Sequence, residues 1–109
     1  MKRCTSSDLL ARFRIMKIKV NFIAVLRSLA KTSSLEVEVP ENSNIKDAIY
    51  IACKGNKELL ERVFEPNKES LKADIIVMVD GVDVNIIGGL NATINNIKEI
   101  TLIPSVHGG

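Results

Sequence analysis

The feature that most constrains this chain is one apolar stripe near its middle. The members of the stripe follow the i, i+3, i+4, i+7, i+8 spacing of an amphipathic helix: Ile45, Ala48, Ile49, Ala52 and Cys53. Asn44 stands before them as a helix N-cap, and Asp47 places a negative charge in the first turn, where it suits the helix dipole. Gly55 stands where a helix commonly ends. The sequence therefore predicts one main helix with a single face to bury.

Strand-like and helical segments lie on both sides of this helix. Residues 17–22 and 35–39 alternate polar and apolar side chains, so we expect two half-buried strands that pair as an antiparallel ribbon. A short helix is expected between them over residues 24–30. A second helical stretch is expected after the main helix, over residues 57–64.

The C-terminal half completes the sheet. Residues 75–79 form a continuous aliphatic run that predicts a central strand. Asp80-Gly81 is a two-residue turn motif that leads into a continuation over residues 82–85. Residues 99–103 predict the last strand. This order of elements predicts an α+β fold in which one sheet packs on one main helix.

The length of the chain allows one domain. With 109 residues, of which 46% are hydrophobic, the chain buries enough surface to fold alone. We expect a flexible N-terminal extension over residues 1–15, a folded domain over residues 16–104 and an extended tail over residues 105–109.

Charge and hydropathy exclude several classes of function. The formal net charge is +2 and charges of both signs are interspersed, whereas nucleic-acid binding favours a basic face interleaved with aromatic side chains. No apolar run approaches the roughly 20 residues of a membrane span. The basic first residues lack the long apolar region of a secretory signal. We therefore expect no nucleic-acid or membrane partner, and a cytoplasmic location.

The chain also lacks the pattern of a self-contained active site. Its one histidine, His107, and its two cysteines, Cys4 and Cys53, have neither metal-site nor triad spacing. Cys53 falls on the apolar stripe and is expected to be a buried thiol. Gly88-Gly89 lacks the basic residue of a phosphate loop, which favours a bend. We therefore expect no cofactor bound by this chain.

The C-terminal sequence offers a different kind of chemistry. Five residues follow the last strand and its proline, and in extended form they would reach roughly 17 Å. The two last residues, Gly108 and Gly109, have no side chains and could thread a narrow channel in a partner. The carboxylate of Gly109 would be ionised at neutral pH and would need activation, for which adenylation by ATP is the economical route. A sulfur donor could then displace AMP and leave a thiocarboxylate, or a lysine amine could attack and leave an amide.

Several motifs together resemble the molybdopterin synthase small subunit (MoaD) family of ubiquitin-like sulfur carriers, which includes archaeal small modifier proteins. The motifs are KIKVNFIAVLR at 17–27, VMVDG at 77–81, GGLNATI at 88–94 and EITLIPSVHGG at 99–109. Two departures are Ser105, which replaces the usual second proline, and residues 96–98, which replace an acidic turn. The resemblance implies a β-grasp (ubiquitin-like) roll with a mixed sheet packed on one main helix.

The resemblance also implies a cycle of partner enzymes. A ubiquitin-activating-type adenylyltransferase would adenylate Gly109 with ATP and magnesium, and a sulfurtransferase would supply sulfur. The thiocarboxylate would then enter the large subunit of molybdopterin synthase, with this chain as a non-catalytic carrier in molybdenum cofactor synthesis. The residues that the resemblance assigns to the site are Gly109 as the reacting end and, as partner contacts, Gly108, His107, Val106, Ile103, Ile23 and Arg27.

Alternatives remain for single residues and for the whole chain. For Ile23 and Ile103 the alternative is ordinary core packing, and for His107 it is a side chain that the tail tolerates. For the chain, the alternatives are a ubiquitin-like modifier joined to lysines through Gly109, a carrier for thiamine or tRNA thiolation, and a binding domain with an incidental Gly-Gly. The long segment 57–72 favours the molybdopterin carrier over the compact thiamine type.

Overall fold

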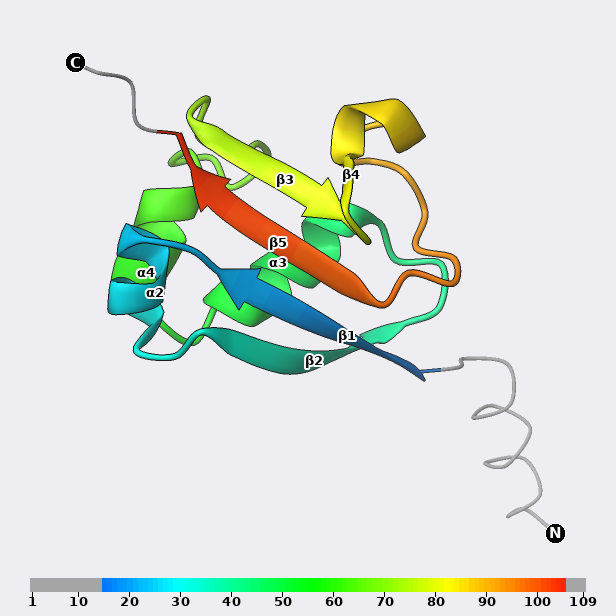
Figure 1. Ribbon diagram of the computed structural model, residues 1–109, viewed down its shortest axis with the longest axis horizontal. Helices are drawn as coiled ribbons and strands as arrows, with labels where there is room; N and C mark the ends of the chain where they lie inside the picture. The colour runs from blue at the N-terminus through cyan, green and yellow to red at the C-terminus, as the bar shows by residue number, and fades with distance from the viewer. Residues whose placement is uncertain (1–14, 106–109) are drawn as a thin grey trace, which may run out of the picture.

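The computed structural model describes residues 15–105 and shows one mixed sheet with helices on one side (Figure 1). Its elements, in chain order, are β1 (Ile15–Phe22), α2 (Val25–Ala30), β2 (Ser34–Pro40), α3 (Ile45–Cys53), α4 (Lys57–Val63), β3 (Ile75–Val79), β4 (Val82–Asp83), the 3-10 helix η1 (Val84–Ile87) and β5 (Glu99–Pro104). The expected α+β class is confirmed. Strand β1 begins one residue before the predicted domain boundary, and residues 1–14 and 106–109 lie outside the described part of the chain.

Strand β5 lies at the centre of the sheet, whose strand order is β2-β1-β5-β3-β4. Strand β1 pairs antiparallel with β2 and parallel with β5, and β3 pairs antiparallel with β5 and β4. The antiparallel ribbon predicted for the first two strands is confirmed. The prediction that residues 75–79 form the central strand is wrong. Within residues 15–105, only the two-residue β4 lies beyond β3, and Ile76 is 38% exposed.

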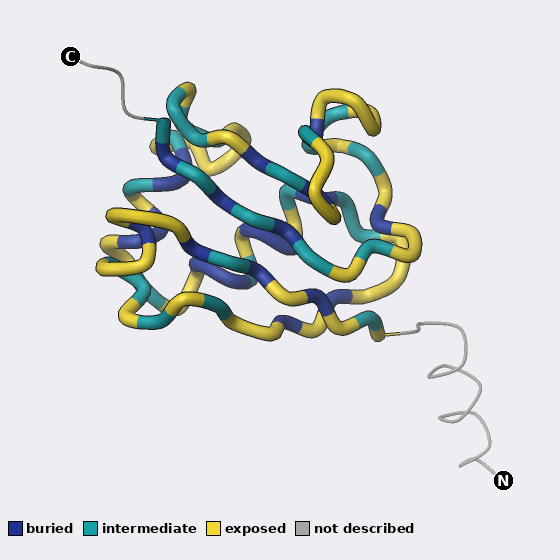
Figure 2. Tube along the Cα trace, viewed as in Figure 1, coloured by how far each residue is buried: buried dark blue, intermediate teal, exposed yellow. Residues whose placement is uncertain are grey.

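Helix α3 packs on one face of the sheet and carries the centre of the core. Its predicted apolar stripe is fully buried. The Asn44 side chain accepts a hydrogen bond from the Asp47 N–H at 2.8 Å, and the Asp47 carboxylate accepts one from the Asn44 N–H at 3.2 Å, so the two residues cap the helix reciprocally. Alternate strand residues face this helix, and Figure 2 shows the resulting alternation of buried and half-buried positions along β5.

The chain after β3 departs from the predicted extended continuation. Asp80 and Gly81 have φ angles of 50° and 84°, as the two-residue turn of a twisted hairpin requires. Strand β4 then stops at Asp83, whose carboxylate accepts a hydrogen bond from the Asn85 N–H at 2.8 Å. The prediction of a strand through residue 85 is wrong because this local bond begins the helical turn η1 instead.

Helix α4 follows α3 through a break centred on Gly55. The predicted end of α3 at Gly55 is confirmed, although Gly55 does not adopt the left-handed backbone of a glycine cap. The α3 helix ends instead with the Asn56 N–H donating to the Cys53 carbonyl at 3.0 Å. The Asn56 side chain then caps α4 by accepting from the Leu59 N–H at 3.1 Å, and it donates to the Leu29 carbonyl at 2.8 Å, which ties α4 to the end of α2.

Candidate functional site

The base of the predicted tail lies at the end of the sheet where β1 and β5 finish side by side and β3 begins (Figure 1). In the antiparallel pairing of β3 with β5, Ile75 is the partner of Pro104. Ser105 continues this pairing, since its N–H donates to the Asp74 carbonyl at 2.7 Å. The predicted site residues beyond this point lie outside the described range: Val106, His107, Gly108 and Gly109.

Ile23 and Ile103 lie side by side on the sheet face that α3 leaves uncovered. The Ile23 N–H donates to the Leu102 carbonyl at 3.2 Å, which extends the pairing of β1 with β5 by one residue. Phe22 and Leu102 are buried under the helices, so strand alternation puts Ile23 and Ile103 on the opposite face. Ile23 is 42% exposed and Ile103 is half-buried. Core packing, the alternative interpretation, therefore does not describe Ile23.

Two more apolar side chains extend this pair across β3. Ile76 is the partner of Ile103, and Met78 is the partner of Thr101. Val77 between them is buried, so Ile76 and Met78 lie on the uncovered face. We call this set the apolar strip: Ile23, Ile76, Met78 and Ile103. Sequence reasoning missed the β3 members because the run of five apolar residues predicted a central strand, and such a run does not show which residues face away from the helices.

Farther from the tail, the same face of the sheet is polar. The Asn21 amide donates to the Glu99 carboxylate at 2.7 Å and to the Thr101 hydroxyl at 3.1 Å, which joins β1 to β5 by side chains. Lys17 and Lys19 follow on β1, in register with two glutamates of β2. The apolar strip therefore begins at the end of the sheet from which Ser105 leaves, and the exposed Ile15 lies on the same face at the far end of β1.

A strained turn leads from Ile23 into α2. Ala24 has φ 56° and ψ −127°, a backbone region that glycine adopts far more readily than a residue with a Cβ atom. The Arg27 N–H donates to the Ala24 carbonyl at 3.0 Å, and Arg27 is exposed in the first turn of the helix. The structure thus brings Ile23 and Ile103 together and places Arg27 on a neighbouring element, one helical turn away.

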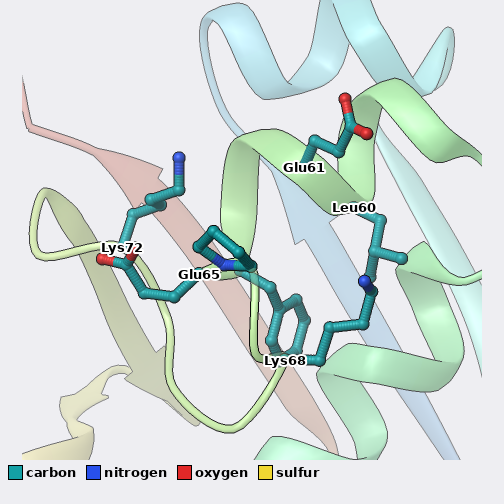
Figure 3. Close-up of a pocket in the computed structure, with 7 residues that line it drawn as sticks. Leu60, Glu61, Glu65, Lys68 and Lys72 are labelled. Carbon is teal, nitrogen blue, oxygen red and sulfur yellow. The ribbon is translucent and has the colours of Figure 1, made fainter.

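A hollow of about 330 Å³ lies between α4 and the loop that follows it (Figure 3). It is lined by Leu60, Glu61, Phe64, Glu65, Pro66, Lys68 and Lys72. Leu60 and Phe64 are buried and make part of the lining apolar. Figure 3 shows the charged ends of the two glutamates and two lysines pointing apart rather than converging. A ligand site is expected to hold convergent polar groups, so this hollow is a weaker candidate than the apolar strip.

Cys53 serves the core rather than the chemistry of the site. Its side chain is fully buried, and burial raises the pKa of the thiol to about 12. The thiol is therefore protonated and unreactive at neutral pH, as its place on the predicted stripe implies. Within residues 15–105, no three metal-binding side chains come together, and no helix is both long and apolar enough to cross a membrane.

Comparison with solved structures defines the class of fold. SAMP1 from Haloferax volcanii, a small archaeal modifier protein, matches with a TM-score of 0.74 at 24% identity, over 86% of this chain and 100% of the other. A chain of the Amycolatopsis orientalis BexX/CysO complex matches with a TM-score of 0.66 at 25% identity, over 84% and 99%. A candidate molybdopterin converting factor, subunit 1, from Pyrococcus furiosus matches with a TM-score of 0.61 at 23% identity, over 84% and 99%. The fold is therefore the ubiquitin-like β-grasp that the sequence resemblance implied.

The family is identified by sequence. The sequence model of the Urm1 family, the ubiquitin related modifier, matches residues 17–109. The chain belongs to this family of small ubiquitin-like proteins. A comparison with curated proteins finds no match in sequence. The complex of BexX with CysO shows that a protein of this fold binds a partner protein.

Proposed function

We propose that this protein is a sulfur carrier of molybdenum cofactor synthesis, loaded as a thiocarboxylate on Gly109, and that it acts in the cytoplasm. The observation that carries the proposal is that Ile23, Ile103 and Ile76 of the apolar strip lie beside the sheet end from which Ser105 leaves. A partner that covers the strip holds the domain with the tail beside its own active site. Four partly exposed apolar side chains at one place are the kind of surface that a partner covers.

The chemistry belongs to the partners, and the chain supplies an accessible carboxylate. A ubiquitin-activating-type adenylyltransferase uses ATP and magnesium in its own site. The Gly109 carboxylate attacks the α-phosphate, pyrophosphate leaves, and an acyl adenylate forms. The terminal sulfur of a persulfide on the sulfurtransferase then attacks the acyl carbon, and AMP leaves. A second thiol of the sulfurtransferase cleaves the acyl disulfide, which forms a disulfide on that enzyme and releases the thiocarboxylate. The resulting thiocarboxylate enters the large subunit of molybdopterin synthase. Gly108 offers no side chain to the entry channel, and Val106 and His107 contact its walls.

A second candidate function is conjugation to lysine side chains. The family model is that of a ubiquitin related modifier, and SAMP1 is named a modifier protein. The activation step is the same. A lysine amine then attacks the adenylate, AMP leaves, and an amide joins Gly109 to the target protein.

The mass of the protein purified from its own cells distinguishes the two candidates. A sulfur carrier shows a species heavier by the exchange of one oxygen for sulfur, and alkylation of that species shows a reactive thiocarboxylate. A modifier shows tail remnants on lysines of other proteins. The same spectrum establishes whether the mature chain ends at Gly109.

An extended variant tests the requirement for a free terminus. One alanine added after Gly109 should abolish activation and leave the thermal unfolding midpoint unchanged. One alanine added before Met1 is the matched control and should change neither. An extended protein, verified by mass to retain its alanine, that still supports cofactor synthesis would contradict the carrier proposal.

A further inference from the structure

Helix α4 is connected to the base of the tail by a short chain of backbone hydrogen bonds. The Lys72 N–H donates to the Val63 carbonyl at the end of α4, at 2.8 Å. The Ile75 N–H donates to the Lys72 carbonyl at 3.1 Å, so residues 72–75 form a compact turn between α4 and β3. Within this turn, the Asp74 carbonyl accepts the Ser105 N–H at 2.7 Å. The tail therefore leaves from a junction of β5 with the segment behind α4.

One ion pair holds this junction from the side. Arg62 of α4 donates two hydrogen bonds to the two carboxylate oxygens of Asp74, at 2.7 Å and 3.2 Å. This paired geometry fixes the direction as well as the distance between the two groups. The hydrogen bond from Arg62 lowers the pKa of Asp74, so the pair is ionised at neutral pH. The side chains are 32% and 33% exposed.

We propose that Arg62 and Asp74 are positioning residues that set the direction in which the tail leaves the domain. This inference rests on the proposed function, because it concerns delivery of Gly109 to an activating enzyme. We call the Arg62–Asp74 pair together with the Asp74–Ser105 hydrogen bond the tail clip. By this inference, α4 and the segment after it contribute to delivery of the terminus and not only to the core.

The physical basis is the entropy of placing a chain end. Four residues follow Ser105 in the sequence, and in extended form they span about 14 Å. A small rotation of the backbone at Ser105 therefore moves Gly109 by several times as much as it moves Pro104. Fixing the base before binding removes part of the ordering cost that association otherwise carries. By this inference, the apolar strip binds the domain to the partner, and the tail clip sets the direction in which the tail leaves the domain.

The alternative is that the ion pair serves stability alone. Ion pairs as exposed as this one contribute little to stability, so the two roles are experimentally separable. A structural role changes the unfolding transition. A positioning role raises the KM for the protein in the activation reaction. It leaves kcat unchanged, because the reacting groups themselves are not altered.

The test uses the full-length protein and its adenylating enzyme in an ATP–pyrophosphate exchange assay. The single variants are Asp74→Asn, which keeps side-chain size, and Arg62→Gln, which removes the guanidinium; both keep the Asp74 backbone carbonyl. The third variant is the exchanged pair, Arg62→Asp with Asp74→Arg. We expect the KM for the protein to rise about two- to fivefold in each single variant, with kcat unchanged. The exchanged pair should recover part of the loss. Hydrogen exchange of the Ser105 amide, measured by NMR, should accelerate in the same variants.

Lys46→Met is the matched control. In wild type, the Lys46 ammonium group donates a hydrogen bond to the Glu69 carbonyl at 3.1 Å. The Lys46→Met variant therefore also loses a positive charge and a hydrogen bond to the segment after α4. Lys46 takes no part in the tail clip, so KM and Ser105 exchange should stay at wild-type values.

Two outcomes would overturn the inference. One is an unchanged KM in Asp74→Asn and Arg62→Gln, whatever happens to their unfolding midpoints. The other is an equal rise in KM for Lys46→Met, which would show a general effect of charge. If the wild-type protein promotes no ATP–pyrophosphate exchange, the proposed function fails. Hydrogen exchange at the Ser105 amide then tests by itself whether the Arg62–Asp74 pair holds the base of the tail.

Discussion

Ile76 on β3 is the register partner of Ile103 on β5, and both side chains lie on the sheet face that α3 leaves uncovered. Cross-strand apolar pairs of this kind stabilise a sheet by only a few tenths to about 1 kcal/mol. Leaving Ile76 38% exposed keeps apolar area in contact with water that a partner can cover. The Ile76–Ile103 pair therefore contributes a little to the stability of the sheet and also leaves apolar surface for the proposed docking of a partner.

Replacing Ile23 with alanine should weaken binding to the adenylating enzyme. Ile23 is 42% exposed on the apolar strip, so truncation removes contact area from the interface and little from the core. We expect Kd to rise about tenfold, the effect of losing one central contact of about 1.4 kcal/mol. Isothermal titration calorimetry measures it.

Leu35→Ala is the matched control for that experiment. Leu35 is 39% exposed, but it lies on β2 at the far edge of the sheet. The Leu35→Ala variant loses an aliphatic side chain of similar exposure, and its Kd for the adenylating enzyme should stay at the wild-type value. Equal losses of affinity in the two variants would argue against the apolar strip as the docking surface.

Replacing Ala24 with glycine should stabilise the protein. With φ 56° and ψ −127°, Ala24 carries backbone strain that glycine avoids, and we expect a gain of about 1 kcal/mol in the free energy of unfolding. Urea denaturation measures it. Ala30→Gly, at the last residue of α2, where φ is not positive, should instead lose up to about 0.5–1 kcal/mol. Destabilisation by Ala24→Gly would show that the turn is not strained.

The contribution of the Arg62–Asp74 pair should depend on pH in one direction. The hydrogen bond from Arg62 lowers the folded-state pKa of Asp74 below its ordinary value of 3.8. A lowered folded pKa gives a stabilisation that is fully present above the unfolded pKa and is lost as pH falls through the folded pKa. The difference in urea midpoint between wild type and Asp74→Asn should therefore be constant above about pH 5 and shrink below pH 3.8. A difference that grows on acidification would contradict the pairing.

Asp80→Ala should cost more stability than its exposed turn position suggests. The Asp80 carboxylate accepts hydrogen bonds from the Lys98 N–H at 3.1 Å and the Glu99 N–H at 2.9 Å, and its φ of 50° disfavours alanine. We expect a loss of about 1–2 kcal/mol, measured by thermal or urea unfolding. Asp83→Ala removes a single local bond to Asn85 and should cost less. A reversed order would show that the link from Asp80 to the start of β5 carries little energy.

The elements of the fold could be predicted because each rests on a local pattern. The helical stripe of α3 and the alternation in β1 and β2 determine which face is buried, and both were predicted within one or two residues. Asn44 was predicted as the cap of α3 for the same reason, since the capping residue and its partner are three positions apart.

The remaining features depend on tertiary neighbours. Ile76 and Met78 were assigned to a central strand because an apolar run does not reveal that the helices cover only one face of the sheet. The contact of Arg62 with Asp74 spans an irregular loop, which no periodicity describes. Of the proposed site, Ile23 and Ile103 came from family resemblance, and their proximity became visible only with the pairing of β1 and β5.

The small size of the apolar strip has a consequence for the order of events. Four partly exposed side chains form one contiguous surface, and stable complexes bury a far larger area. As the docking surface, it admits one enzyme at a time and releases it readily. On the proposed function, the adenylating enzyme and the sulfur acceptor would compete for the same contacts, and the chemical state of the terminus would decide which of them binds next.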